Sequence, residues 1–146
     1  MVVVCIVILV YMVLLLGLAV ASPGIGLTGA LLALVPDDWR DWAHVPAYGI
    51  LAWLVMQGFR LRGWPLPYAL LSGLAVTVTF GLWTEVAQGS IPGREASLPD
   101  LAKDGAGALL AAVMIGCQTL IGRPAEIAGS QAIEELSQTR KGSRER

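Results

Sequence analysis

The sequence predicts an all-α membrane protein, built as a bundle of four transmembrane helices with both termini in the cytoplasm. Hydrophobic side chains make up 55% of the 146 residues and charged ones only 14%, which is too apolar for an ordinary soluble domain. The hydrophobic residues gather into four long runs, at about 2–21, 42–59, 68–88 and 100–121. Each run is close to the ~20 residues that cross a hydrocarbon core about 30 Å thick. A formal net charge of −1 argues against nucleic acid as a partner, because phosphate binding needs a basic surface.

The first run, residues 2–21, consists almost entirely of Val, Leu and Ile and predicts a membrane-spanning helix. The alternative is a cleaved signal peptide, because the small residues at 19–21 ahead of Ser22 resemble a cleavage site. A retained helix is favoured, since no Lys or Arg precedes the run and it is longer than a usual signal core. Cys5 and Cys117 lie within apolar runs and are expected to act as small hydrophobic residues rather than as a disulfide or metal pair.

The second and third runs are expected to form a helical hairpin. Residues 42–59 follow an acidic segment that contains tryptophan, which is typical of the headgroup level of a membrane. Pro46 is tolerable because it is expected in the first turn of this helix. A proline-containing turn then leads into the third run, at 68–88. Threonines within it, such as Thr84, can bond back to the helix backbone or across to a neighbouring helix.

The fourth run, residues 100–121, follows a loop rich in glycine and proline. Ser97 is expected to cap the helix, with Asp100 in the first turn, where a negative charge favours the helix dipole. Small residues recur every four positions along this helix and let a partner helix approach closely. This small-residue stripe comprises Ala108, Ala112 and Gly116. Residues 122–146 are expected to form a polar cytoplasmic tail, partly disordered.

The distribution of basic residues predicts which side each helix end faces. The turn between the second and third runs carries Arg60 and Arg62, and the tail carries five basic residues. The connector before the second run and the loop before the fourth carry one arginine each, Arg40 and Arg94. By the positive-inside rule, both termini and the turn lie in the cytoplasm. The opposite ends of the last three helices then meet near the outer leaflet.

Polar side chains gather at this outer end and define a candidate site. Polar groups set into the ends of membrane helices are costly and point to a function. Residues three or four apart share a helix face. The sets that do so are His44 with Tyr48, Glu85 with Gln88, and Asp100 with Lys103 and Asp104. The candidate catalytic residues are His44, Glu85 and Asp100. The candidate ligand-binding residues are Tyr48, Gln88, Arg94, Ser97 and Asp104.

Four uses of these residues are open. One is general acid–base chemistry by His44 with Glu85 or Asp100, in which Arg94 stabilises an anionic group. A second is a divalent metal held by His44, Glu85 and Asp100, but no motif of metal-ligand spacing supports it, and neither a metal nor a cofactor is predicted. A third is recognition, in which Arg94 and the start of the fourth helix hold a phosphate or carboxylate headgroup. The fourth is structural: Glu85, Arg94 and Asp100 pair only to pin the loop across the helix ends.

These residues resemble the VanZ-like family of small membrane proteins. The family pattern has a His and a Tyr four residues later, then E-x-x-Q-x-x-x-P-G-R, then S-x-x-D, then an Asn and two Gly. The corresponding positions here are His44, Tyr48, Glu85, Gln88, Pro92, Gly93, Arg94, Ser97, Asp100, Asp104 and Gly107. The resemblance covers roughly residues 41–121. Three features depart from the pattern: Arg40-Asp41 reverse the charge order of the usual Asp-Lys pair, Asp104 replaces Asn, and Ala111 replaces the last Gly.

The resemblance implies a contribution to low-level resistance against teicoplanin-type glycopeptides, which act at the outer face of the membrane on lipid-linked wall precursors. The expected function is binding of an amphiphilic envelope ligand: a lipid headgroup, a lipid-linked wall precursor or a glycopeptide antibiotic. The main alternative is a membrane-embedded enzyme that uses His44 with Glu85 or Asp100 as acid and base on a lipid-linked phosphate or acyl group. A third alternative is a non-catalytic subunit that packs its small-residue stripe on another membrane protein.

Overall fold

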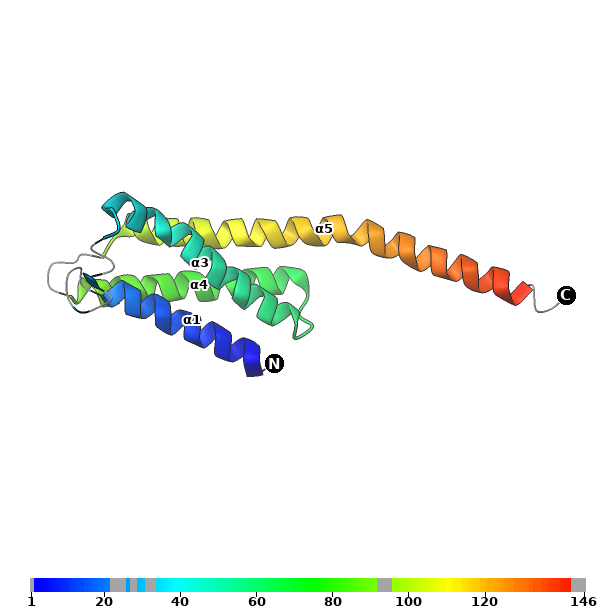
Figure 1. The fold of residues 1–146 in the computed structure, drawn as a ribbon, viewed down its shortest axis with the longest axis horizontal. Helices are drawn as coiled ribbons and strands as arrows, with labels where there is room; N and C mark the ends of the chain where they lie inside the picture. The colour runs from blue at the N-terminus through cyan, green and yellow to red at the C-terminus, as the bar shows by residue number, and fades with distance from the viewer. Residues whose placement is uncertain (1, 22–25, 27–28, 31–33, 92–95, 143–146) are drawn as a thin grey trace. The chain divides into compact units, whose positions relative to one another are not determined.

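All the regular secondary structure in the described part of the chain is α-helix. The computed structural model describes residues 2–21, 26, 29–30, 34–91 and 96–142. Its long helices are α1 (Val2–Val20), α3 (Asp37–Arg60), α4 (Leu66–Gly89) and α5 (Leu98–Gly142) (Figure 1). Three segments are long and apolar enough to cross a membrane: α1, α4 and Leu98–Ile121 of α5. The predicted all-α class is confirmed, whereas the predicted span at 42–59 and the cytoplasmic termini stay predictions.

Helix α3 begins five residues before the predicted second span. Pro46 therefore lies inside the helix, and its expected place in the first turn is wrong. Proline has no N–H, so the carbonyl of Trp42 loses its usual helical donor at this point. Helix α3 is not among the three apolar segments, because it carries polar residues such as His44 and Gln57 along its length.

The chain divides into two compact units, Met1–Val113 and Met114–Arg146. In the first unit, α3 packs against both α1 and α4, and α1 also packs against α4. The centre of this packing is an apolar cluster of Leu15, Tyr48, Leu51, Val55 and Phe80. Helix α5 continues without a break through the second unit to Gly142, past the end of the predicted fourth span and into the segment expected to be a polar tail.

Glycines bring α3 and the first part of α5 together. A Cβ atom at Gly107 would collide with the carbonyl oxygen of Val45, and a Cβ at Gly49 would lie 3.2 Å from the carbonyl oxygen of Gly107. The two backbones can therefore approach this closely only because Gly49 and Gly107 have no side chain. In the small-residue stripe, Ala108 is fully buried and Ala112 is half-buried. Contact of the stripe with a partner protein stays a prediction.

Three helix ends of the first unit meet at one end of the bundle. The start of α3, the end of α4 and the start of α5 lie together there, and the turn from α3 to α4 lies at the opposite end (Figure 1). That turn contains Gly63, whose φ of +79° favours glycine. The predicted convergence of separated polar segments therefore has its structural basis in the up-and-down order of α3, α4 and α5.

Candidate functional site

The centre of the site is a pair formed by His44 of α3 and Asp104 of α5. The Nδ1 atom of His44 lies 2.8 Å from Oδ1 of Asp104, with the imidazole side chain 22% exposed and the carboxylate fully buried. The partner predicted for His44 was Glu85 or Asp100, and Asp104 was predicted only to bind a ligand. Asp100 instead accepts a hydrogen bond from Lys103 Nζ at 2.7 Å. Asp100 and Asp104 lie one helical turn apart on the same face of α5, about 6 Å along its axis. The close contact of Gly107 with α3 places Asp104, rather than Asp100, level with His44.

Glu85 joins α4 to the start of α5. Its side chain is buried, and its Oε2 accepts a hydrogen bond from the backbone N–H of Ser97 at 2.6 Å. The Oγ of Ser97 accepts a hydrogen bond from the N–H of Asp100 at 3.3 Å, so the predicted capping role of Ser97 is confirmed. The second carboxylate oxygen of Glu85, Oε1, is buried without a hydrogen-bond partner among the described residues. Glu85 is thus half-satisfied.

Tyr48 and Thr84 form a buried hydroxyl pair next to His44. Their oxygens lie 2.5 Å apart, and Thr84 Oγ1 donates to the carbonyl of Gly81 at 2.8 Å. Because the only hydroxyl hydrogen of Thr84 is used in that bond, Tyr48 must be the donor to Thr84. The Tyr48 ring stacks with the His44 ring at a centroid distance of 5.9 Å. The predicted shared face of His44 and Tyr48 is therefore confirmed, as is the predicted bonding of Thr84 both within and between helices.

Gly81 makes room for the buried carboxylate of Asp104. A Cβ atom at this position would lie 2.8 Å from Oδ2 of Asp104. That oxygen has no hydrogen-bond partner among the described residues. Gly81 was not among the residues predicted from the sequence to form the site. The available signal was its position one helical turn before Glu85, on the same face of α4.

Lys103 connects α5 to the start of α3 next to the site. Its ammonium group donates to Asp100 at 2.7 Å and to Asp41 of α3 at 3.2 Å. The Asp41 side chain is 65% exposed, and exposed ion pairs of this kind contribute little to stability. Arg94, predicted to bind a ligand, lies outside the described residues, as do Pro92 and Gly93 of the quoted motif.

A small cavity opens beside the polar cluster. Its volume is about 160 Å³. Residues of α1, α3 and α4 line it: Leu15, Leu18, Ala19, Arg40, Ala43, His44, Ala47, Tyr48 and Gln88. Three of the predicted site residues, His44, Tyr48 and Gln88, thus share one cavity with an apolar wall. Such a combination suits a ligand that is polar at one end and apolar at the other.

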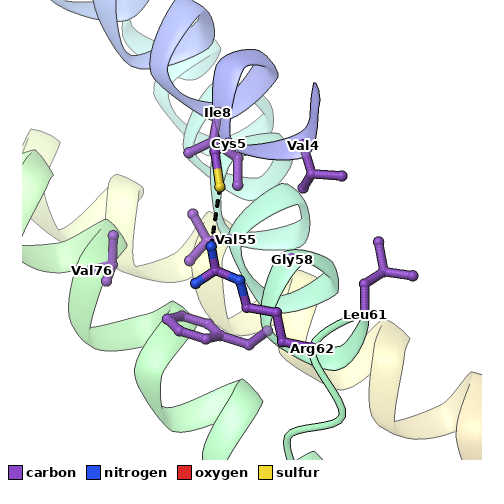
Figure 2. Close-up of a pocket in the computed structure, with 9 residues that line it drawn as sticks. Val4, Cys5, Ile8, Val55, Gly58, Leu61, Arg62 and Val76 are labelled. Carbon is purple, nitrogen blue, oxygen red and sulfur yellow. Dashed lines mark hydrogen bonds between the residues drawn. The ribbon is translucent and has the colours of Figure 1, made fainter. Parts of the chain in front are cut away.

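A larger cavity lies near the turn from α3 to α4. Figure 2 shows its lining, which is apolar except for Arg62, whose Nη2 donates to the sulfur of Cys5 at 3.2 Å. Its volume is about 400 Å³. None of the predicted site residues lines it, so size alone does not identify the functional site here.

One group of side chains has the proximity that a metal site requires. One ligand atom from each of His44, Glu85 and Asp104 lies within 4.8 Å of the other two. The third residue is Asp104, whereas the metal alternative predicted from the sequence had Asp100 in that place. The three side chains come from three different helices, and two of them, Glu85 and Asp104, are buried.

The fold and the site together define a class: a helical protein with membrane-length apolar helices and a buried polar cluster at one end of the bundle. No family model, curated protein or solved structure matches the chain. Membership of the VanZ-like family therefore stays a prediction that depends on the quoted motif residues.

Proposed function

We propose that this chain is a multi-pass cell-membrane protein that binds an amphiphilic molecule of the cell envelope at an outward-facing site, as the resemblance to the VanZ-like family implies. The observation that supports the proposal most strongly is the cavity beside His44. Its wall contains Leu15 and Leu18, which suit an acyl chain, and the polar residues Tyr48 and Gln88. Binding sites for such molecules combine an apolar surface with a few fixed polar groups.

The size of the cavity limits what enters it. Sites that enclose a drug-sized ligand measure roughly 300–1,000 Å³, well above the 160 Å³ found here. Only part of the ligand fits, such as the first segment of an acyl chain or one headgroup substituent. The remainder of the ligand lies outside the cavity, against its mouth. A lipid, a lipid-linked wall precursor and a lipoglycopeptide all have this chemistry.

Orientation follows from the charge distribution. With α3 as a further membrane span beside α1, α4 and the first part of α5, Arg60 and Arg62 lie at the end opposite to His44 and Glu85. The positive-inside rule assigns that basic end to the cytoplasm. The site then faces the outer leaflet, where wall precursors and glycopeptides are found.

Binding is tested with a variant that fills the cavity. Ala43 lines the cavity and its side chain is exposed, so Ala43→Leu occupies the mouth without overpacking a core. Short-chain phosphatidic acid and teicoplanin are titrated separately into the purified protein in detergent, and the saturable rise in unfolding temperature is measured. We expect at least one probe to saturate, and Ala43→Leu to weaken its binding tenfold or more.

Ala102→Leu is the matched control, because Ala102 is exposed on α5 and does not line the cavity. Its affinity should equal that of the unmodified protein. Comparing the two probes separates a lipid from a glycopeptide ligand. Equal effects of the two substitutions, or no saturation with either probe, would contradict the proposal.

A second candidate function is acid–base catalysis on such a ligand, favoured by the pair of His44 and Asp104. A buried carboxylate that holds one imidazole nitrogen orients the ring and leaves the other nitrogen able to transfer a proton. The measurement is release of phosphate or fatty acid from a lipid-linked precursor. In this case His44→Gln abolishes release while binding persists, whereas a pure binding protein shows no release in either form.

A further inference from the structure

We propose that His44, Glu85 and Asp104 bind a divalent transition-metal ion, with Zn²⁺ as the best fit. The proposal is independent of amphiphile binding, because it depends on three side chains that meet at the interface of α3, α4 and α5. Glu85 and Asp104 are 3% and 0% exposed. The two acids belong to different helices, Glu85 to α4 and Asp104 to α5.

The carboxylates are each half-satisfied in the same way. Glu85 accepts a hydrogen bond through Oε2 from Ser97, and Asp104 is bonded through Oδ1 to His44. The other oxygen of each, Oε1 and Oδ2, is buried with no hydrogen-bond partner among the described residues. Buried polar atoms in native proteins nearly always have a partner, and an unpaired buried charge is costly. A cation between the two acids would satisfy both.

The spacing of the three side chains suits a metal. In a tetrahedral site with bonds of about 2.0–2.2 Å, ligand atoms lie roughly 3.3–3.6 Å apart. Atoms of His44, Glu85 and Asp104 already lie within 4.8 Å of one another. Side-chain movements of about an ångström would bring these atoms to the ligand spacing of a tetrahedral site. The atoms of His44 and Asp104 that lie 2.8 Å apart share a proton, and binding of a metal releases protons from its ligands.

The donor atoms select the kind of ion. One imidazole nitrogen with two carboxylate oxygens is a set that Zn²⁺ and neighbouring transition metals accept, whereas Ca²⁺ and Mg²⁺ prefer oxygen ligands alone. Three protein ligands leave a fourth position for water or an anionic group. The hydrogen bond from Ser97 to Glu85 is the type of outer contact that orients a metal-binding carboxylate.

The test measures metal binding directly. The full chain is purified in detergent, stripped with a chelator and titrated with ZnCl₂ by calorimetry, and the bound metal is counted by elemental analysis. We expect one Zn²⁺ per chain with a dissociation constant in the micromolar range or tighter. Asp104→Asn and Glu85→Gln each weaken binding at least tenfold while keeping side-chain shape, and MgCl₂ in excess does not compete.

Asp41→Asn is the matched control, because Asp41 is an exposed acid at the same end of the bundle and is not part of the group. Its affinity for Zn²⁺ should be unchanged. If the site variants fail to fold, Co²⁺ added to the unmodified protein should give a visible absorption spectrum of nitrogen and oxygen ligation that Zn²⁺ abolishes. Absence of stoichiometric binding, loss of affinity in Asp41→Asn, or no such spectrum would overturn the proposal, and none of these outcomes depends on amphiphile binding.

Discussion

At the scale of single residues, the direction of one hydrogen bond decides how two substitutions differ. Tyr48 donates to Thr84, and Thr84 donates to Gly81. Thr84→Val leaves the buried Tyr48 hydroxyl without its acceptor, which costs about 1–3 kcal/mol. Tyr48→Phe costs less, because Thr84 keeps its own bond to Gly81. We therefore expect Thr84→Val to destabilise the protein more than Tyr48→Phe does, measured by unfolding in detergent.

The double variant provides the check on this assignment. When Tyr48→Phe is added to Thr84→Val, no unpaired hydroxyl remains, and stability should recover towards that of Tyr48→Phe alone. Strictly additive losses would show that Tyr48 and Thr84 are not coupled in this way.

Helical periodicity in the sequence predicts which residues share a helix face, but not which faces contact each other. Spacing alone indicates that His44 and Tyr48 share a face, and that Asp100 and Asp104 share another. It does not indicate which of the two acids meets His44, because that depends on the depth at which α3 and α5 touch. The contact is made by Gly49 and Gly107, and no local pattern reveals which glycines of two distant segments oppose each other.

At the scale of helices, Gly107 controls the distance between α3 and α5. A Cβ at this position would collide with the backbone of Val45, and backbone cannot rotate away as a side chain can. Gly107→Ala should destabilise the protein by about 1–3 kcal/mol and separate His44 from Asp104. The measurement is the unfolding midpoint in detergent, together with Zn²⁺ affinity.

Gly105 is the matched control for this substitution. It lies two residues away on α5, and a Cβ there would meet nothing within 4 Å. Gly105→Ala should keep or increase stability, by up to about 1 kcal/mol, because alanine favours helix over glycine. Equal losses in both variants would contradict a specific close contact at Gly107, because helix propensity alone favours alanine at both positions.

The helix boundaries were predicted well where a local sequence signal marks them and poorly where none does. The third run, predicted at 68–88, appears as α4 at Leu66–Gly89, because a proline-containing turn marks its start and Ser90 follows its end. Helix α3 begins earlier than the hydrophobic run that predicted it, since charged residues also form helix. Hydrophobicity reports the apolar part of a helix rather than its ends.

At the scale of the whole molecule, the all-α class and the convergence of the polar segments were predictable. Alternating apolar runs and short connections require that the start of α3, the end of α4 and the start of α5 share one end of the bundle. The extent of α5 was not predictable, because its second half carries too few apolar residues to read as part of a span. The side of the membrane is a separate question, which only the charge distribution addresses.

Labelling with an impermeant thiol reagent tests whether the end of the bundle that carries the site faces the outside of the cell. Both native cysteines are replaced by serine, and a single cysteine is placed by Ser90→Cys beside the site or by Leu61→Cys at the opposite end, both at exposed positions. In intact cells the reagent should label the cysteine at position 90, and should reach the one at position 61 only after the membrane is permeabilised. Labelling of position 61 alone in intact cells would contradict an outward-facing site, and equal labelling of both would contradict a membrane-spanning bundle.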